Sequence, residues 1–174
     1  MIKENSMKLF SIALLLLFCC LSACVTTTTP RPEPTSRMPF PEEEYLILPK
    51  SGKVTVTGQA FLKTRGGDVK MAAGNEILLE PVTSYSKEWY EKYALTWGRI
   101  SPPDERLWKY VRKQIADGSG RFSFKNVPAG EYFISTEVTW EAPAGYQSSL
   151  QRQGGIIIKR ITIGTEDVEV IVTR

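Results

Sequence analysis

Apolar and polar residues alternate along most of the chain after residue 45, in short runs separated by Gly, Pro, Asn and Asp. In residues 53–63 the apolar face holds Val54, Val56, Ala60 and Leu62, with Gly58 among them. A two-residue period is typical of a half-buried strand. The same pattern predicts strands at 69–72, 76–80, 121–124, 131–140, 155–163 and 168–173, and residues 111–115 alternate again. About seven short strands joined by such turns predict a mainly β fold, an antiparallel seven-stranded β-sandwich.

A helical period interrupts this pattern in an insertion at residues 82–109. Ser86 is a candidate cap for a first helix. Ser101, followed by Pro102 at the first helical position, is the candidate start of a second. The insertion is therefore expected to add one or two short helices to the sandwich.

Within the insertion, Trp89, Tyr93 and Trp97 recur every four residues and would share one helical face. Aromatic residues at this spacing usually pack as core, which would make the insertion a cover over one end of the sandwich. Alternatively, exposed rings would form a platform for a sugar or a partner protein. We expect Trp89 to be largely buried and Trp97 to be more accessible. Residues 141–155 are expected to form a second long connection that can border the same surface.

The stretch from residue 117 to residue 134 combines a glycine turn with two apolar strands. Phe122 and Phe124 should point inward, and a tight connection at 128–130 should return the chain as a hairpin through Tyr132 and Ile134. This stretch resembles the signature of carboxypeptidase-regulatory-like domains, which are transthyretin-type sandwiches. The resemblance extends over residues 53–81 and 110–173. It implies the same fold, and a non-catalytic accessory module of the kind found on secreted and surface proteins.

The first residues of the chain have the pattern of an export signal. Lys3 and Lys8 precede an apolar stretch at 9–21, which as a helix spans roughly 20 Å and is too short for a ~30 Å hydrocarbon core. Leu21-Ser22-Ala23-Cys24 follows and resembles the lipobox of bacterial lipoproteins. The resemblance implies a signal peptide at 1–23 and a mature protein that begins with a lipidated Cys24. It also implies attachment to the cell envelope, at the outer membrane where there are two membranes, on its periplasmic or surface face. The alternatives are an ordinary secretory signal or an uncleaved anchor.

Residues 24–44 differ in composition from the remainder of the chain. They are rich in threonine and proline and show no apolar periodicity. Such a segment is expected to be an extended, mobile tether without buried partners. The folded domain is accordingly predicted at 45–174.

Composition removes most catalytic chemistries. The chain has no histidine, which excludes Ser-His and Cys-His nucleophiles and the commonest zinc ligands. After cleavage at Cys24 one cysteine remains, so neither a disulfide nor a cysteine metal cluster is expected. The formal charge of +3 is spread over interspersed acids and bases, which argues against a nucleic-acid partner.

These observations predict a lipid-anchored envelope protein with a non-catalytic β-sandwich used for binding or scaffolding. Neither a catalytic site, a metal nor a cofactor is expected. The membrane is the expected partner through Cys24, and an envelope protein or a glycan is a candidate second partner, while the sequence does not identify the ligand. Two alternatives remain open at this point. One is a carbohydrate-binding module that uses the aromatic residues of 82–109, and the other is a structural subunit of an envelope complex.

Overall fold

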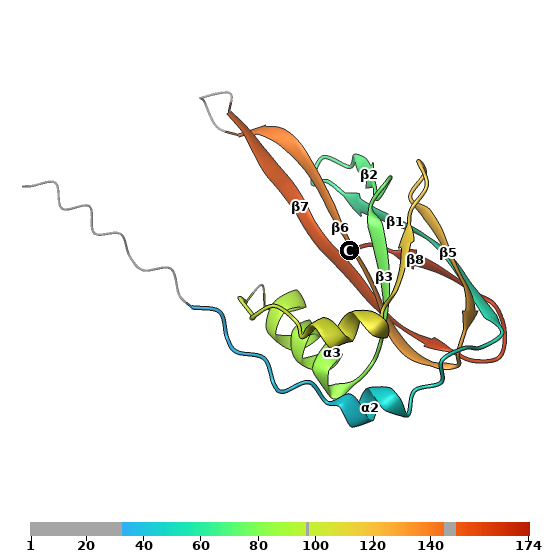
Figure 1. Ribbon diagram of the computed structural model, residues 1–174. Helices are drawn as coiled ribbons and strands as arrows, with labels where there is room; N and C mark the ends of the chain where they lie inside the picture. The colour runs from blue at the N-terminus through green and yellow to red at the C-terminus, as the bar shows by residue number, and fades with distance from the viewer. Residues whose placement is uncertain (1–32, 97, 145–148) are drawn as a thin grey trace, which may run out of the picture. The chain divides into compact units, whose positions relative to one another are not determined.

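The computed structural model describes residues 33–96, 98–144 and 149–174. Two β-sheets make up most of this structure (Figure 1). The first sheet joins β1 to three other strands, with the bounds β1 (Val54–Lys63), β2 (Val69–Met71), β5 (Arg121–Val127) and β8 (Val168–Val172). The second has the order β4 (Arg112–Ile115), β3 (Glu76–Pro81), β6 (Gly130–Ala144) and β7 (Ser149–Ile163). Every neighbouring pair is antiparallel except β1 and β8, which are parallel. The described residues thus hold eight strands rather than seven, because the alternation at 111–115 forms a separate strand, β4.

One apolar core fills the space between the two sheets. Most of its members come from β1, β3, β5, β6, β7 and β8, and those on β1, β5 and the start of β6 include the residues predicted to point inward. Gly58 lies at the centre of the first sheet, where its register partners are Phe122 on β5 and Val170 on β8. A Cβ atom at this position would lie 2.4 Å from the Val170 carbonyl oxygen, so the close strand packing requires glycine.

The predicted hairpin at 121–134 is wrong in its pairing and right in its core residues. β5 pairs with β1, whereas β6 pairs with β3 and β7, so the connection at 128–130 crosses from one sheet to the other. Phe122, Phe124, Tyr132 and Ile134 nevertheless all lie in the shared core. Alternation shows which face of a strand is buried, but it does not show which strand lies beside it. Gly130 has a φ of 153°, a conformation that a side chain would strain.

β6 and β7 form a long hairpin that extends beyond the other strands of its sheet (Figure 1). Their register runs without a break from Gly130 opposite Ile163 to Ala144 opposite Ser149. The long connection predicted at 141–155 is therefore mostly strand. Its residues are largely solvent-exposed on both faces, so no apolar alternation marked them as strand.

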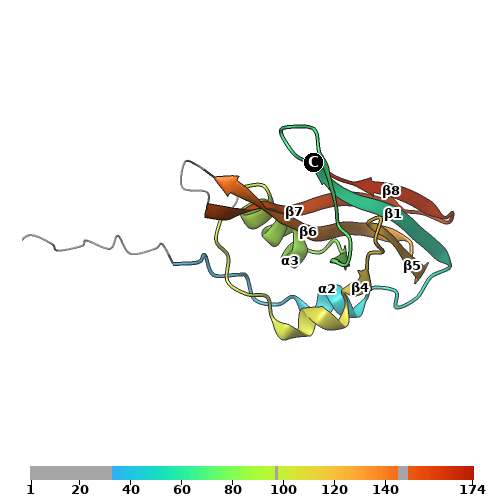
Figure 2. The same cartoon turned by 90° about the horizontal axis from the view of Figure 1, so that it is seen from above.

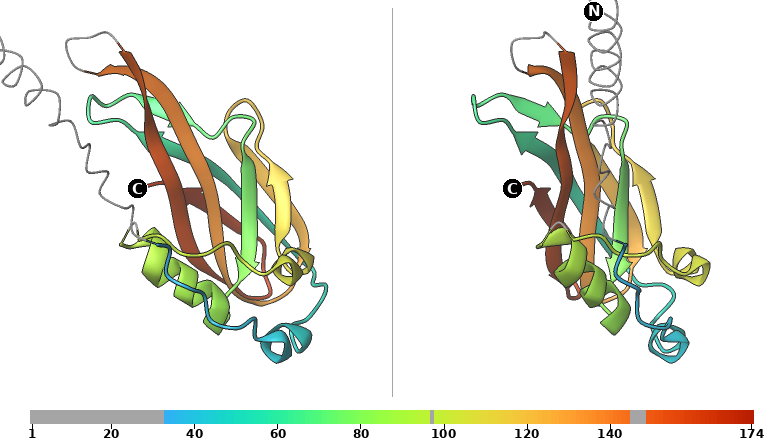
Figure 3. Two further views of the ribbon diagram at one scale, coloured as in Figure 1. Left: turned by 60° about the vertical axis from the view of Figure 1, so that its left-hand side comes forward. Right: turned by 90° about the vertical axis from the view of Figure 1, so that its left-hand side faces the viewer.

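The helical elements cover the outer face of the second sheet, away from β1 and β8 (Figures 2 and 3). They are α2 (Glu42–Leu46), α3 (Ser84–Trp89), the π-helix η1 (Tyr90–Ala94) and the 3₁₀ helix η2 (Glu105–Lys109). The insertion thus holds short helices, as expected. Their starts differ from the prediction: Thr83 caps α3 in place of Ser86, and Asp104 caps η2 in place of Ser101.

The segment Pro34–Leu46, here called the N-terminal strap, belongs to the folded unit Pro34–Arg174 and packs against the rest of it. Tyr45 is 1% exposed and forms a second core with Tyr85, to which Met38 and Phe40 add partly buried side chains. The prediction of a partnerless tether up to residue 44 is therefore wrong from residue 34 onward. The misleading feature was the high proline content, which hid single apolar residues that find partners only in the tertiary structure. Cys24 and residues 25–32 lie outside the described residues.

Candidate functional site

A groove of about 460 Å³ lies on the outer face of the second sheet, beside the end of α3. Its floor comes from β3, β6 and β7, and its near end comes from the turn that precedes β3. The lining side chains include one tryptophan and several polar groups: Asn75, Glu76, Trp89, Ser135, Glu137 and Arg152. The register places Ile156 of β7 directly opposite Glu137 of β6, so one edge of the floor is apolar. A groove of this size falls within the range of small-molecule sites.

Trp89 and Tyr93 form an aromatic pair at the groove. Both rings are half-buried, and their centroids lie 5.7 Å apart with an interplanar angle of 22°. The pair spans the junction between α3 and the π-helix η1, where the i, i+4 spacing still stacks the two side chains. On the same helix, Tyr90 stacks on Phe133 of β6 at 4.8 Å and thereby fixes the insertion to the sheet.

The polar side chains of the groove are held by contacts among themselves. Arg152 of β7 forms an ion pair with Glu137 of β6 at 2.9 Å. Asn75 donates a hydrogen bond from Nδ2 to the Glu137 carbonyl oxygen at 2.6 Å. Ser135 also lines the groove and is 7% exposed, and its hydroxyl makes no hydrogen bond to any described residue. The groove thus offers carboxylate, amide, guanidinium and hydroxyl groups beside an indole ring.

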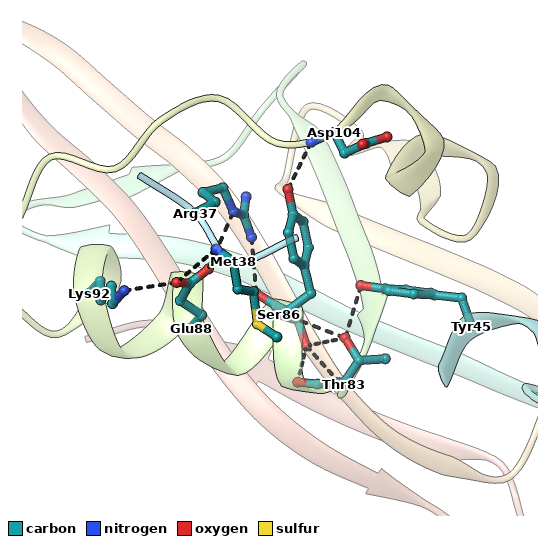
Figure 4. A network of polar contacts seen from close by, with 9 residues as sticks. Arg37, Met38, Tyr45, Thr83, Ser86, Glu88, Lys92 and Asp104 are labelled. Carbon is teal, nitrogen blue, oxygen red and sulfur yellow. Dashed lines mark hydrogen bonds and ion pairs between the residues drawn. The ribbon is translucent and has the colours of Figure 1, made fainter. Parts of the chain in front are cut away.

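The N-terminal strap holds the helix that carries Trp89 (Figure 4). Glu88 of α3 accepts hydrogen bonds from the Met38 backbone N–H, at 3.1 and 3.0 Å, and from Lys92 Nζ at 2.8 Å. Arg37 stacks its guanidinium 3.7 Å from the centroid of the Tyr85 ring and donates to the Tyr85 carbonyl oxygen at 3.0 Å. Burial raises the pKa of Glu88, but the hydrogen bonds from Lys92 and Met38 outweigh it and hold that pKa below its usual value.

The start of α3 is also fixed from the strap. Thr83 and Ser86 form a reciprocal capping box, and Thr83 Oγ1 donates to the hydroxyl of Tyr45 at 2.9 Å (Figure 4). Glu44 accepts a hydrogen bond from the Ser84 backbone N–H at 2.8 Å and another from the Ser84 hydroxyl. These bonds satisfy the N–H groups of Ser84 and Ser86 in the first turn of the helix. The position of Trp89 therefore depends on residues that precede it by more than forty positions.

Glu80 of β3 lies beneath α3 and the N-terminal strap. Its Oε1 atom is out of contact with water and has no hydrogen-bond partner among the described residues, although the residue as a whole keeps partial exposure. Burial raises the pKa of Glu80 to about 7, against the opposing attraction of Arg37. A carboxyl group in this position is therefore mostly protonated below pH 7 and mostly charged above it.

Glu80→Gln is expected to remove a pH dependence from the stability of the protein. Because the pKa of Glu80 is higher in the folded state (about 7) than in the unfolded state (4.5), its ionisation opposes folding. The free energy of unfolding of the wild type should fall by about 1 kcal/mol per pH unit across this window. The variant should lack that fall and be more stable than the wild type above pH 7. Urea unfolding at several pH values measures the difference, with Glu76→Gln, an exposed carboxyl, as control. Parallel curves for wild type and Glu80→Gln would contradict the assignment.

The structure brings together two of the three aromatic residues predicted for a ligand platform. Trp89 and Tyr93 are neighbours, whereas Trp97 lies outside the described residues. Trp89 is half-buried: most of its surface is covered, and part of it faces the groove. Arg152, from the segment predicted to border this surface, does line the groove. Ser135 and Glu137 were missed, because the strand register that brings them beneath Trp89 cannot be read from periodicity.

Neither a metal cluster nor a membrane-spanning helix is found in the part of the chain that the structure describes. No group of three or more Cys, Asp or Glu side chains in this part is arranged to hold a metal ion. Likewise, none of its helices combines the length and the apolar character that crossing a bilayer requires.

Comparison with known proteins places this chain beside a solved bacterial structure. Neither a family model nor a curated protein matches the chain. Among solved structures, the chain is similar to "a putative carbohydrate binding protein" from Pseudomonas aeruginosa, with 33% sequence identity and a TM-score of 0.69. The match covers 79% of this chain and 99% of the Pseudomonas protein. At this identity and coverage, the chain belongs to the same family as that Pseudomonas aeruginosa protein.

Proposed function

We propose that the protein is a non-catalytic carbohydrate-binding module of the cell envelope and that the groove beside Trp89 receives the glycan. The observation that carries the proposal is the half-buried Trp89, stacked on Tyr93, over a floor of polar side chains. The description of the Pseudomonas relative as a putative carbohydrate binding protein supports it.

The groups in the groove suit the chemistry of a sugar ring. The C–H bonds on one face of a pyranose pack well against an aromatic ring, while its hydroxyl groups both donate and accept hydrogen bonds. Glu137 and Ser135 can accept hydrogen bonds, and Arg152, Asn75 and Ser135 can donate them. The ion pair between Arg152 and Glu137 keeps both groups in place before the ligand arrives, which lowers the entropic cost of binding.

The envelope location belongs to the same proposal and rests on the sequence. The lipobox-like Leu21-Ser22-Ala23-Cys24 supports a mature protein that is lipidated on Cys24, at the outer membrane if there are two membranes. Two or more acyl chains would give stable attachment. The finer fold assignment, a transthyretin-type sandwich like those of carboxypeptidase-regulatory-like domains, is proposed on the motif at 117–134.

Trp89→Ala is expected to abolish most glycan binding. The indole supplies the largest apolar contact of the groove, and loss of such a central aromatic group costs an interface at least about tenfold in affinity. The measurement is isothermal titration of the wild type and the variant with the best ligand from a glycan array of envelope and extracellular polysaccharides.

Two further variants make this test specific. Trp108→Ala removes a 44%-exposed tryptophan that does not line the groove, and it should bind like the wild type. Arg152→Met removes a donor that is 66% exposed without disturbing the core, and it should weaken binding severalfold. Equal affinity of wild type, Trp89→Ala and Arg152→Met would contradict the groove as the site. The absence of any glycan ligand on the array would contradict the function itself.

A further inference from the structure

A second cavity, of about 400 Å³, lies at the opposite end of the second sheet and shares no lining residue with the groove. It is enclosed by the segment after α2, by the junction of η2 and β4, and by the connection from β5 to β6. Its walls are largely apolar or aromatic and include Tyr45, Pro81, Val111 and Tyr132. The cavity therefore offers a preformed space for a compact ring or a short apolar group.

The charged side chains that line this cavity are all positive. Lys50, Lys109 and Arg112 line it, whereas no Asp or Glu is among its lining residues. Among the described residues, the ammonium groups of Lys50 and Lys109 have neither an ion-pair partner nor a hydrogen-bond partner. Three positive side chains around a partly open cavity with a mixed lining form a field that a negative ligand group would neutralise.

Arg112 connects the segments that form the walls of the cavity. Its guanidinium donates to the Lys125 carbonyl oxygen at 3.0 Å and to the Lys50 carbonyl oxygen at 3.1 Å. These two bonds connect β4 to the segment before β1 and to the end of β5, so they hold the walls of the cavity at a set distance. Tyr132 is also immobilised, because its hydroxyl donates to the Pro128 carbonyl oxygen at 3.0 Å. The mobile donors that remain for a ligand are the two ammonium groups and the hydroxyl of Tyr110, which has no hydrogen bond to a described residue.

We propose that this cavity is a second binding site, specific for a small organic anion whose acidic group is carried on a ring. The ring would enter between the tyrosine and proline side chains, and the carboxylate would lie between Lys50 and Lys109. A neutral ring compound lacks the negative charge that would pair with the two lysines. An inorganic anion lacks the apolar ring that would fill the cavity between the tyrosine and proline side chains. The site is independent of the glycan groove, so either can exist without the other.

The test uses benzoate as the probe, followed by ¹H–¹⁵N correlation spectra of the protein. Benzoate should shift the amide signals of Val111, Arg112 and Tyr132 in a saturable way. Benzyl alcohol and inorganic phosphate, which match its ring and its charge separately, should bind at least about fivefold more weakly. Affinity for benzoate should also fall when the ionic strength is raised, because exposed charges are screened.

The variant Lys50→Ala/Lys109→Ala should weaken benzoate binding at least about fivefold, since it removes both free cations and no buried group. Lys63→Ala/Lys70→Ala removes the same charge from β1 and β2, outside the cavity, and should bind like the wild type. The proposal is overturned if benzoate causes no saturable shift at these amides, or if benzyl alcohol binds equally well. It is also overturned if the two double variants bind benzoate with the same affinity.

Discussion

A chain that begins at Tyr45 should be less stable than one that begins at Pro34 by at least about 4 kcal/mol. The shorter chain loses Met38 and Phe40 from the second core, and Phe40 is the ring that stacks on Tyr45 at 4.7 Å. It also loses Arg37, whose guanidinium covers the Tyr85 ring. Differential scanning calorimetry should show a thermal midpoint lower by about 10 °C or more.

Two point variants separate packing from simple shortening of the chain. Phe40→Ala in the longer chain should reproduce a large part of the loss, because it removes the stacking partner of Tyr45 and an edge contact to Tyr85. Glu43→Gln changes an exposed strap residue and should leave the midpoint unchanged. Equal midpoints for the chains that begin at Pro34 and Tyr45 would show that the strap contributes no stability.

The strap connects the proposed anchor to the proposed site. It supplies Glu44 and Tyr45 to the start of α3 and the Met38 N–H to Glu88, and α3 in turn carries Trp89. Loss of the strap should therefore weaken glycan binding as well as stability. If Cys24 is the lipidated residue, only a short segment separates the membrane from the residues that position the groove.

The sequence was sufficient for the fold class because burial on one face leaves a period in the chain. The inward residues of β1, β5 and β6 were predicted individually, whereas the requirement for glycine at residue 58 became evident only from the packing of the first sheet. What periodicity does not contain is strand pairing. The pairing of β5 with β1, in place of β6, depends on contacts between residues far apart in the chain.

The candidate site could be predicted only in its aromatic part. Trp89 and Tyr93 stand out because helical spacing is a local property. Asn75, Ser135 and Arg152 come from a turn and two strands, and they meet only through the register of β3, β6 and β7. The strap was missed for the same reason, since Arg37 and Phe40 have no periodic neighbours and acquire their partners from α2, α3 and η2 in the tertiary structure.

Phe124→Ala should cost roughly 3–5 kcal/mol of the free energy of unfolding. Phe124 is 2% exposed, belongs to the core between the sheets and lies 5.8 Å from the Phe122 ring. It pairs with Val56 of β1 in the first sheet. Truncation removes the transfer energy of the ring and leaves a cavity that two hydrogen-bonded sheets cannot easily close.

Phe61→Ala is the matched control, because Phe61 lies on the neighbouring strand β1 with its side chain only half-buried, opposite Met71 of β2. The same truncation there removes fewer contacts and encloses no cavity, so it should cost less than half as much. Guanidinium unfolding followed by tryptophan fluorescence measures both variants, and similar denaturant slopes would confirm that the comparison concerns stability alone. Equal losses in the two variants would contradict the division of this sheet into an inner and an outer face, since that division alone makes Phe124 different from Phe61.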